Sequence, residues 1–210
     1  VIFFSLEMSS VQLATRILSE RAEIDSENLR LGKNLNEEAY AKIIDANTEI
    51  YESPFYIDET PALTLSQIAS RSRRLKRKLG GKLGLIVIDY IQLIMPQKSN
   101  FSENRVQELS AITRGLKALA KELNVTVLDW SQLSRAVEQI EDKRPNLSEW
   151  RESGSIEQYA DVVMFVFREW YYHEKAEPIR KSDETEESFN ERFQNWKSYA
   201  DKIHGQAQVI

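Results

Sequence analysis

Short apolar runs of strand character alternate with longer stretches of helical periodicity, and this alternation limits the fold more than any other feature. The apolar runs are VIFF (1–4), FYI (55–57), LGLIVIDY (83–90), VTVLDW (125–130), DVVMFVF (161–167) and AQVI (207–210). Between them the periodicity predicts helices over 11–21, 36–51, 64–79, 103–123 and 131–137. Strands joined by helices of this length are typical of crossover units, which make neighbouring strands parallel. The sequence therefore predicts an α/β fold with a mostly parallel sheet flanked by helices.

The composition is that of a globular protein and excludes several kinds of site. Of the 210 residues, 41% are hydrophobic, and no apolar run approaches the roughly 18 residues of a membrane helix. Cysteine is absent and histidine occurs only twice, which argues against disulfides and against Cys or His metal sites. The net charge of −5 argues mildly against a nucleic-acid partner, but base gathers over 71–78 and acid over 183–187. We expect a cytoplasmic protein with no membrane segment, and the total charge does not decide its partner.

The strongest local signal for a functional site is LIVIDY (85–90). An apolar strand that ends in an acid, here Asp89, has the arrangement of a Walker B motif. Its carboxylate holds Mg²⁺ directly or through water, and the metal bridges nucleotide phosphates. The pattern is common, and an Asp that only caps a strand end is the alternative.

Two further polar side chains follow predicted strands. Glu7 comes after VIFF, and Ser131-Gln132 comes after VTVLDW. If these strands are neighbours of the strand that ends in Asp89, Glu7 can polarise an attacking water and Gln132 can contact a γ-phosphate. The alternatives are charge complementation of the following helix by Glu7 and helix capping by Ser131.

The phosphate-binding loop that should complete such a site does not occur in these 210 residues. The pattern GxxxxGK followed by Ser or Thr is absent, since the glycines stand at positions 32, 80, 81, 84, 115, 154 and 205. Both ends of the sequence, Val1 and Ile210, lie inside apolar runs. We therefore expect the sequence to be a piece of a larger domain.

Three polar regions have less specific patterns. RESGS (151–155) suits contact with a nucleic-acid backbone, but for five residues of loop a solvated turn is the better explanation. Arg71, Arg74 and Lys78 recur at helical spacing, which is more typical of a solvated or subunit-facing surface than of a DNA groove. The charged stretch 171–205 is expected to be a helical insertion whose aromatic residues form a packing stripe.

Nine long stretches of the sequence are specific when taken together. They are SLEMS (5–9), QLATRILSE (12–20), YIDETPALTLSQI (56–68), RRLKR (73–77), LIVIDYIQLI (85–94), NRVQELSAITRGLKALAKELNV (104–125), SQLSRAVEQ (131–139), DKRPNLSEWRESGSIEQ (142–158) and ADVVMFVFRE (160–169). These stretches resemble the motor domain of the bacterial replicative DNA helicases of the DnaB family. The resemblance is continuous over about residues 1–170 and weak again at AQVI.

The resemblance implies a RecA-like ATPase that uses ATP and Mg²⁺. It implies that Glu7 activates water, that Asp89 binds the metal and that Gln132 senses the γ-phosphate. It also places DNA contacts at Arg151, Glu152 and Gly154. The implied partners are single-stranded DNA, five further copies in a hexameric ring, a helicase loader and a primase.

The resemblance also implies what is missing. The family's phosphate loop precedes the strand VIFF, and its arginine finger follows AQVI, so we expect residues 1–210 to be a partial motor domain that is inactive by itself. Four residues depart from the family pattern, namely Asp129, Trp130, Trp150 and Tyr159. The alternatives are a non-enzymatic split or degenerate helicase product and, less favoured by the motifs, another RecA-like ATPase.

Overall fold

The computed structural model describes residues 1–96, 105–133, 143–146 and 154–210. These residues form two compact units, Val1–Gln132 and Leu133–Ile210. Among the described residues, none of the helices combines the length and the apolarity that crossing a membrane requires.

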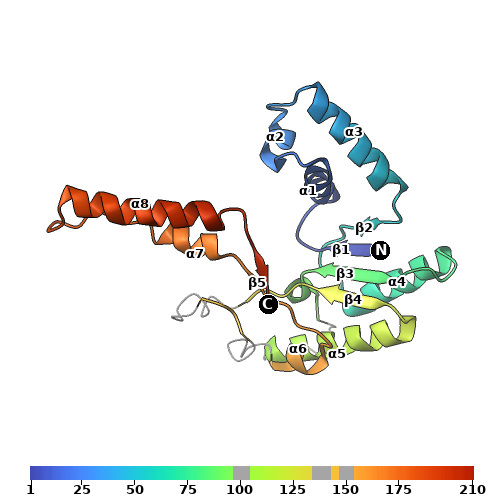
Figure 1. Ribbon diagram of the computed structural model, residues 1–210. Helices are drawn as coiled ribbons and strands as arrows, with labels where there is room; N and C mark the ends of the chain where they lie inside the picture. The colour runs from blue at the N-terminus through green and yellow to red at the C-terminus, as the bar shows by residue number, and fades with distance from the viewer. Residues whose placement is uncertain (97–104, 134–142, 147–153) are drawn as a thin grey trace. The chain divides into compact units, whose positions relative to one another are not determined.

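A four-stranded parallel sheet forms the centre of the first unit (Figure 1). Its strands are β1 (Ile2–Ser5), β2 (Tyr56–Asp58), β3 (Leu85–Asp89) and β4 (Thr126–Asp129), in the spatial order β2-β1-β3-β4. In register, Ile2 lies opposite Ile86, and Ile86 lies opposite Val127. The parallel α/β fold predicted from the alternation of strands and helices is confirmed.

Polar side chains accept hydrogen bonds from the first N–H groups of several helices of this unit. The helices are α1 (Ser10–Ala22), α2 (Ser26–Leu31), α3 (Glu37–Glu52), α4 (Leu65–Lys78) and α5 (Arg105–Leu123). The side chains of Ser9, Asn36 and Thr64 accept backbone hydrogen bonds at the starts of α1, α3 and α4. Periodicity predicted four of these helices and missed α2, because six residues give less than two turns of pattern.

One face of the sheet carries the main hydrophobic core. Phe4, Ile86 and Ile88 are 0% exposed and alternate with residues on the opposite face. They pack against the apolar stripes of α4 and α5, which include Ile68, Leu109, Ile112 and Leu116. The α5 residues of this core recur at 3–4 spacing, which is the helical periodicity that predicted a helix over 103–123.

The second unit has a smaller framework. Its elements are α6 (Gly154–Tyr159), β5 (Val166–Phe167), α7 (Glu169–Lys175), α8 (Glu186–Ile203) and β6 (Gln208–Val209). Strands β5 and β6 pair with each other in an antiparallel sheet.

Two predictions of secondary structure need correction. The run 161–167 was expected to be one strand, but only Val166–Phe167 is a strand, because pairing with β6 begins only at Phe165 and Ile210. Val162 and Met164 are 73% and 56% exposed, and none of the described strands pairs with them. The helix expected over 131–137 is wrong at 131–133, which are not helical, and its remaining residues lie outside the described ones.

Aromatic side chains hold α7 against α8. The rings of His173 and Trp196 stack with centroids 5.1 Å apart, and the Trp196 ring also contacts Trp170 and Phe193. Trp196 Nε1–H donates a hydrogen bond to the His173 carbonyl at 3.1 Å. The aromatic residues at helical spacing on α8 therefore pack within the unit, as the sequence predicted.

Candidate functional site

The carboxyl ends of β1 and β3 lie side by side. Ser5 is opposite Asp89 in the register of the two strands, and the Leu6 N–H donates to the Asp89 carbonyl at 2.9 Å. The Ser5 hydroxyl donates to the Met8 carbonyl at 2.7 Å, which closes the turn that carries Glu7. The structure thus brings Glu7 and Asp89, 82 positions apart in the chain, to one edge of the sheet.

The charge of Glu7 acts on the Asp89 carboxyl. Burial raises the pKa of the Asp89 carboxyl, the negative charge of Glu7 raises it further, and the positive charge of Arg16 on α1 lowers it. Because the Asp89 side chain is only partly exposed, an ionised carboxylate there is poorly solvated. A cation at this edge would relieve that cost. This is an electrostatic reason for a metal or another positive group to bind beside Asp89.

The amino end of α1 is capped without any contribution from Glu7. The Ser9 hydroxyl accepts from the Gln12 N–H, and Gln12 Oε1 accepts from the Ser9 N–H at 3.0 Å. The Ser10 N–H donates to the carboxylate of Glu59, which follows β2, and this hydrogen bond lowers the pKa of Glu59. Glu7 is exposed and α1 has no acid in its first turn. Ser9 and Gln12 make the cap hydrogen bonds of α1. These contacts do not test the alternative that the charge of Glu7 complements this helix.

Gln132 lies at the carboxyl end of β4, the neighbour of β3. Gln92, in the short 3₁₀ helix η1 (Ile91–Leu93) that follows β3, fixes the backbone of this segment. Gln92 Nε2 donates to the Ser131 hydroxyl at 2.9 Å and to the Gln132 carbonyl at 3.2 Å. The Gln132 side chain is exposed. Ser131 accepts this hydrogen bond instead of capping a helix, so the capping alternative for Ser131 is not what the structure has.

The carboxylates at this edge fit Mg²⁺ better than a metal that needs a protein cage. In the described part of the chain, no three His, Cys, Asp or Glu side chains are grouped as a metal cluster. Mg²⁺ typically takes one or two carboxylates and completes its octahedron with water and nucleotide phosphates. Asp89, with Glu7 in electrostatic reach, meets that requirement.

The other predicted site residues fall at or beyond the limit of what the structure describes. Arg151 and Glu152 lie outside the described residues, as does Trp150. Gly154 is the first residue of α6. The DNA-contacting loop is therefore a prediction that the structure does not test.

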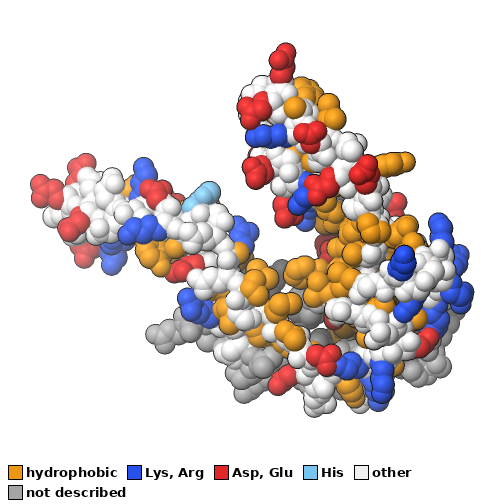
Figure 2. Space-filling view, turned by 45° about the vertical axis from the view of Figure 1, so that its right-hand side comes forward, with side chains coloured by type: hydrophobic (Ala, Val, Ile, Leu, Met, Phe, Trp, Pro, Cys, Tyr) orange, Lys and Arg blue, Asp and Glu red, His pale blue; other side chains and the backbone are white. Residues whose placement is uncertain are grey.

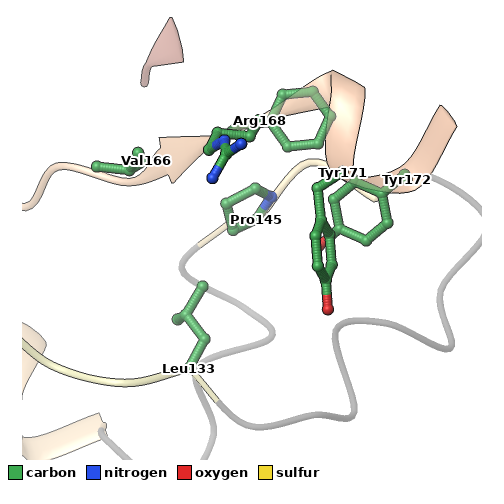
Figure 3. Close-up of a pocket in the computed structure, with 7 residues that line it drawn as sticks. Leu133, Pro145, Val166, Arg168, Tyr171 and Tyr172 are labelled. Atoms are coloured by element: carbon green, nitrogen blue, oxygen red, sulfur yellow. The ribbon is translucent and has the colours of Figure 1, made fainter. Parts of the chain in front are cut away.

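Two cavities among the described residues are lined by residues other than the predicted site residues. In the second unit, a cavity of about 200 Å³ is lined by side chains from three segments, including Leu133, Pro145, Val166 and Tyr171 (Figure 3). In the first unit, a shallow cavity of about 520 Å³ lies at the carboxyl end of α4 and includes Arg73, Lys76 and Arg77. Figure 2 shows Lys and Arg side chains gathered around that end of the unit. Arg73 is paired with Glu122 at 2.7 Å. Of the predicted basic face, Arg71 is partly buried and paired with Asp58, whereas Arg74 and Lys78 are exposed.

Comparison with known proteins identifies the family. The family model described as the DnaB-like helicase C terminal domain matches residues 1–193. The chain belongs to the DnaB-like helicase family. The replicative DNA helicase DnaB of Rickettsia bellii is 51% identical over 208 residues, which are 99% of this chain and 40% of that protein. DnaB of Geobacillus stearothermophilus is 50% identical over 177 residues, which are 84% of this chain and 38% of that protein.

Solved structures of DnaB-like helicases agree in fold. A DnaB-like replicative helicase, described with its interactions with primase, aligns with a TM-score of 0.76 and 37% identity over 88% of this chain and 42% of its own. A solved ATPase domain aligns with a TM-score of 0.77 and 38% identity over 83% of this chain and 61% of its own. The parallel sheet and its helices match the RecA-like ATPase domain of these helicases. The chain spans about two fifths of the length of the DnaB relatives it matches.

Two of the residues that depart from the DnaB pattern can be placed relative to the sheet. Asp129 pairs with Ile88 rather than with Asp89, so its side chain lies on the opposite face of the sheet from Asp89. Burial raises the pKa of Asp129. Trp130, the next residue, is 48% exposed. Asp129 therefore does not add a third carboxylate to the pair formed by Glu7 and Asp89. Tyr159 ends α6 in the second unit.

Sequence reasoning missed three residues that shape this DnaB-like site. Gln92 holds the Gln132 segment, Glu59 holds the start of α1, and Arg16 lowers the pKa of Asp89. All three lie inside the stretches that resemble the family. Their types gave no signal by themselves, because each depends on contacts between strand ends that only the fold brings together.

Proposed function

We propose that this chain is the ATP-hydrolysing part of a replicative DNA helicase motor. In this motor, ATP hydrolysis drives translocation along single-stranded DNA and the unwinding of duplex DNA. Membership of the DnaB-like family supports the general activity. The observation that carries the proposal is the meeting of Glu7 and Asp89 at the carboxyl edge of adjacent parallel strands.

Each of the three site residues has a role suited to its position. Asp89 holds Mg²⁺ through its partly buried carboxylate, and the bound metal supplies charge neutralisation at the nucleotide phosphates. Glu7 stands on an exposed turn, where its carboxylate can accept a proton from the attacking water. Gln132 presents an amide at the end of β4 that can donate to a γ-phosphate oxygen and so report its presence.

The wider function follows the family. Arg151, Glu152 and Gly154 contact the backbone of single-stranded DNA, and six copies form a ring around it. A ring needs phosphate-attracting groups only at its pore, which reconciles DNA binding with a net charge of −5. Residues 1–210 are part of a RecA-like motor domain, in which 171–205 form a charged helical insertion. The motor works in the cytoplasm with a loader and a primase.

The 210 residues taken by themselves are expected to hydrolyse ATP slowly, because they contain no Gly-rich loop to hold the phosphates. The competing function is a non-enzymatic one, in which the chain only joins a ring. Mixing the chain with an intact helicase tests this competing function. Unchanged unwinding and an unchanged hexamer mass exclude ring incorporation.

A chimaera tests the proposed activity with this chain's own residues. In it, the chain replaces the matching segment of the Rickettsia bellii helicase, to which it is 51% identical. We expect Mg²⁺-dependent ATP hydrolysis that single-stranded DNA stimulates. Loss of a general base typically lowers kcat by about 10²-fold or more, and we expect that loss for Glu7→Gln. Asp89→Asn should remove the dependence of turnover on Mg²⁺ together with most of the turnover.

Glu27→Gln is the matched control, because Glu27 is an exposed carboxylate on α2 whose contact with Arg30 is long, at 3.9 Å. It should hydrolyse ATP at the rate of the unsubstituted chimaera. If the Glu7→Gln chimaera keeps its full kcat, Glu7 is not the general base and the assignment of this edge fails.

A further inference from the structure

The side chain of Gln92 connects the strand that ends in Asp89 to the segment that carries Gln132. Gln92 is the third residue after Asp89, in the middle of the single turn η1. Both polar atoms of its amide bind the backbone of Gln132. Nε2 donates to the Gln132 carbonyl at 3.2 Å, and Oε1 accepts from the Gln132 N–H at 3.4 Å. Nε2 also donates to the Ser131 hydroxyl at 2.9 Å.

These contacts extend the pairing of the two strands beyond the sheet. The backbone already joins β3 to β4 at this end, because the Ile91 N–H donates to the Trp130 carbonyl and the Trp130 N–H donates to the Ile88 carbonyl, each at 3.0 Å. Past Trp130, the Gln92 side chain continues the pairing where backbone bonds between the segments stop. It therefore fixes Ser131 and Gln132 specifically, rather than holding β4 in general.

The turn that carries Gln92 is itself held firmly. Ile91 and Ile94 are 0% and 1% exposed, so η1 is anchored in the core on both sides of Gln92. The guanidinium of Arg105, at the start of α5, donates to the Gln92 carbonyl. A rigid turn between Asp89 and Gln92 means that a displacement at one of them is passed to the other.

We propose that Gln92 is a positioning residue, which sets the backbone of Gln132 so that the Gln132 amide meets the phosphate of a nucleotide bound at Asp89. The inference rests on the proposed function and deepens it. The Gln132 side chain remains exposed while its backbone is bound on both its N–H and its carbonyl. This is the arrangement expected of a sensor whose side chain is available to a ligand and whose orientation is preset.

The first test measures position without hydrolysis. In the 210-residue chain, amide hydrogen exchange at Gln132 should be about tenfold faster after Gln92→Ala, since the hydrogen bond from that N–H is lost. Gln92→Glu keeps an acceptor for the Gln132 N–H but loses the amide donor, so exchange should be partly restored. Equal exchange in the Gln92→Ala and unsubstituted chains would overturn the inference.

The second test measures the consequence for turnover in the Rickettsia bellii chimaera. Gln92→Ala should lower kcat about tenfold with little change in KM for ATP, and Gln132→Ala should do the same or more. The double variant Gln92→Ala/Gln132→Ala should be no slower than Gln132→Ala, because both substitutions remove one function. Multiplication of the two single effects would overturn the inference.

Gln67→Ala separates positioning from mere stabilisation. Gln67 Oε1 also accepts from a backbone N–H, that of Thr64 at 2.8 Å, but at the start of α4. Its loss should lower the melting temperature while leaving kcat and exchange at Gln132 unchanged. If the unsubstituted chimaera hydrolyses no ATP, the proposed function fails, and the exchange measurement still decides whether Gln92 positions Gln132.

Discussion

The two units of the chain are stabilised in different ways. In Val1–Gln132 a continuous core of aliphatic side chains joins the sheet to α4 and α5, and Phe4, Ile68, Ile86 and Ile88 are all 0% exposed. In Leu133–Ile210 the helices α7 and α8 are joined by contacts between aromatic rings, most of which remain partly exposed. A core of the first kind fixes backbone positions closely, which is what a site built from strand ends requires.

This difference has a functional meaning. Asp89 ends β3, and Glu7 and Gln132 follow β1 and β4 within three residues, so the packing of the first unit sets their separation. The residues proposed to contact DNA belong to the second unit. A nucleotide site needs fixed geometry, whereas contacts with a nucleic-acid backbone tolerate variation.

The largest expected effect comes from truncating one aromatic residue in each unit, which tests whether the first unit is packed more tightly than the second. Phe4→Ala should cost about 3–5 kcal/mol of unfolding free energy, because a fully buried ring leaves a cavity that packed strands cannot close. Phe193→Ala, on α8, should cost about half as much, since that side chain is only partly buried. Urea unfolding gives the total, and hydrogen exchange shows which unit opens. Equal costs would mean that the second unit is packed as tightly as the first.

The same contrast explains which elements the sequence predicted. In the first unit, Leu109, Ile112 and Leu116 repeat with helical spacing, and the four residues before Asp89 in LIVID are all apolar. These patterns predicted the buried elements correctly. In the second unit, the apolar run 161–167 suggested a whole strand, but residues 161–165 are not strand. An apolar pattern predicts a strand only where a partner is available, and the partner β6 is two residues long.

The site was predictable to the extent that it depends on strand ends. Asp89 and Glu7 both follow apolar runs. Because ligands bind at the carboxyl ends of parallel strands, the sequence predicted that these two residues lie at one site. Gln92 was not predictable, because its role comes from its distance to Ser131 and Gln132 across a neighbouring strand. A glutamine in a turn has no chemical signature until that geometry is known.

The Arg71–Asp58 pair tests whether polar contacts also matter at the edge of the first unit. Arg71 Nη1 donates to both carboxylate oxygens of Asp58, at 2.7 and 2.6 Å, and to the Thr60 hydroxyl. Arg71→Ala should cost about 2 kcal/mol, since it leaves a largely buried carboxylate without its charged donor. Arg74→Ala is the control from the same helix and should cost little. Urea unfolding of both variants makes the comparison.

The pH dependence of that cost follows from Asp58. Burial alone would raise its pKa, but the hydrogen bonds from Arg71 and Thr60 outweigh burial and lower it. An acid with a lowered pKa contributes stability above its unfolded pKa, and this contribution is lost as pH falls through the folded value. The difference between Arg71→Ala and the unsubstituted chain should therefore shrink at low pH. A difference that stays constant down to low pH would show that the pair does not act through its charge.

A substitution with a smaller expected effect on stability tests the second unit by itself. Trp196→Phe keeps a ring beside His173 but removes the Nε1–H that donates to the His173 carbonyl. We expect a loss of about 1 kcal/mol, confined to α7 and α8, from hydrogen exchange of these helices. Trp170→Phe is the matched control, because the described residues show no hydrogen bond from its indole. Faster exchange in β1 or β3 of the Trp196→Phe chain would mean that the two units unfold together.

The smallest expected effect is a gain in stability, and it comes from a substitution at Asp89 in the proposed nucleotide site. Burial and the charge of Glu7 raise the pKa of Asp89, so the folded chain holds its proton more tightly than the unfolded chain does. Such a group makes stability fall as pH rises from its unfolded pKa through its folded pKa. Asp89→Asn should therefore stabilise the chain at pH 7, by less than about 1 kcal/mol because the site is partly exposed, or about 1–3 °C.

Melting curves between pH 4 and pH 8 measure this effect. The gain from Asp89→Asn should shrink as pH falls toward the unfolded pKa of Asp89, because below it Asp89 of the unsubstituted chain is protonated in both the folded and the unfolded state. Asp201→Asn, at an exposed position on α8, is the control. In a Glu7→Gln background the gain should be smaller, because one of the two causes of the raised pKa is already gone. An unchanged gain in that background would mean that Glu7 and Asp89 do not influence each other. The comparison of the two units depends on this interaction. The packing of the first unit is proposed to hold the carboxylates of Glu7 and Asp89 at one edge of the sheet, where both can act on a bound metal ion.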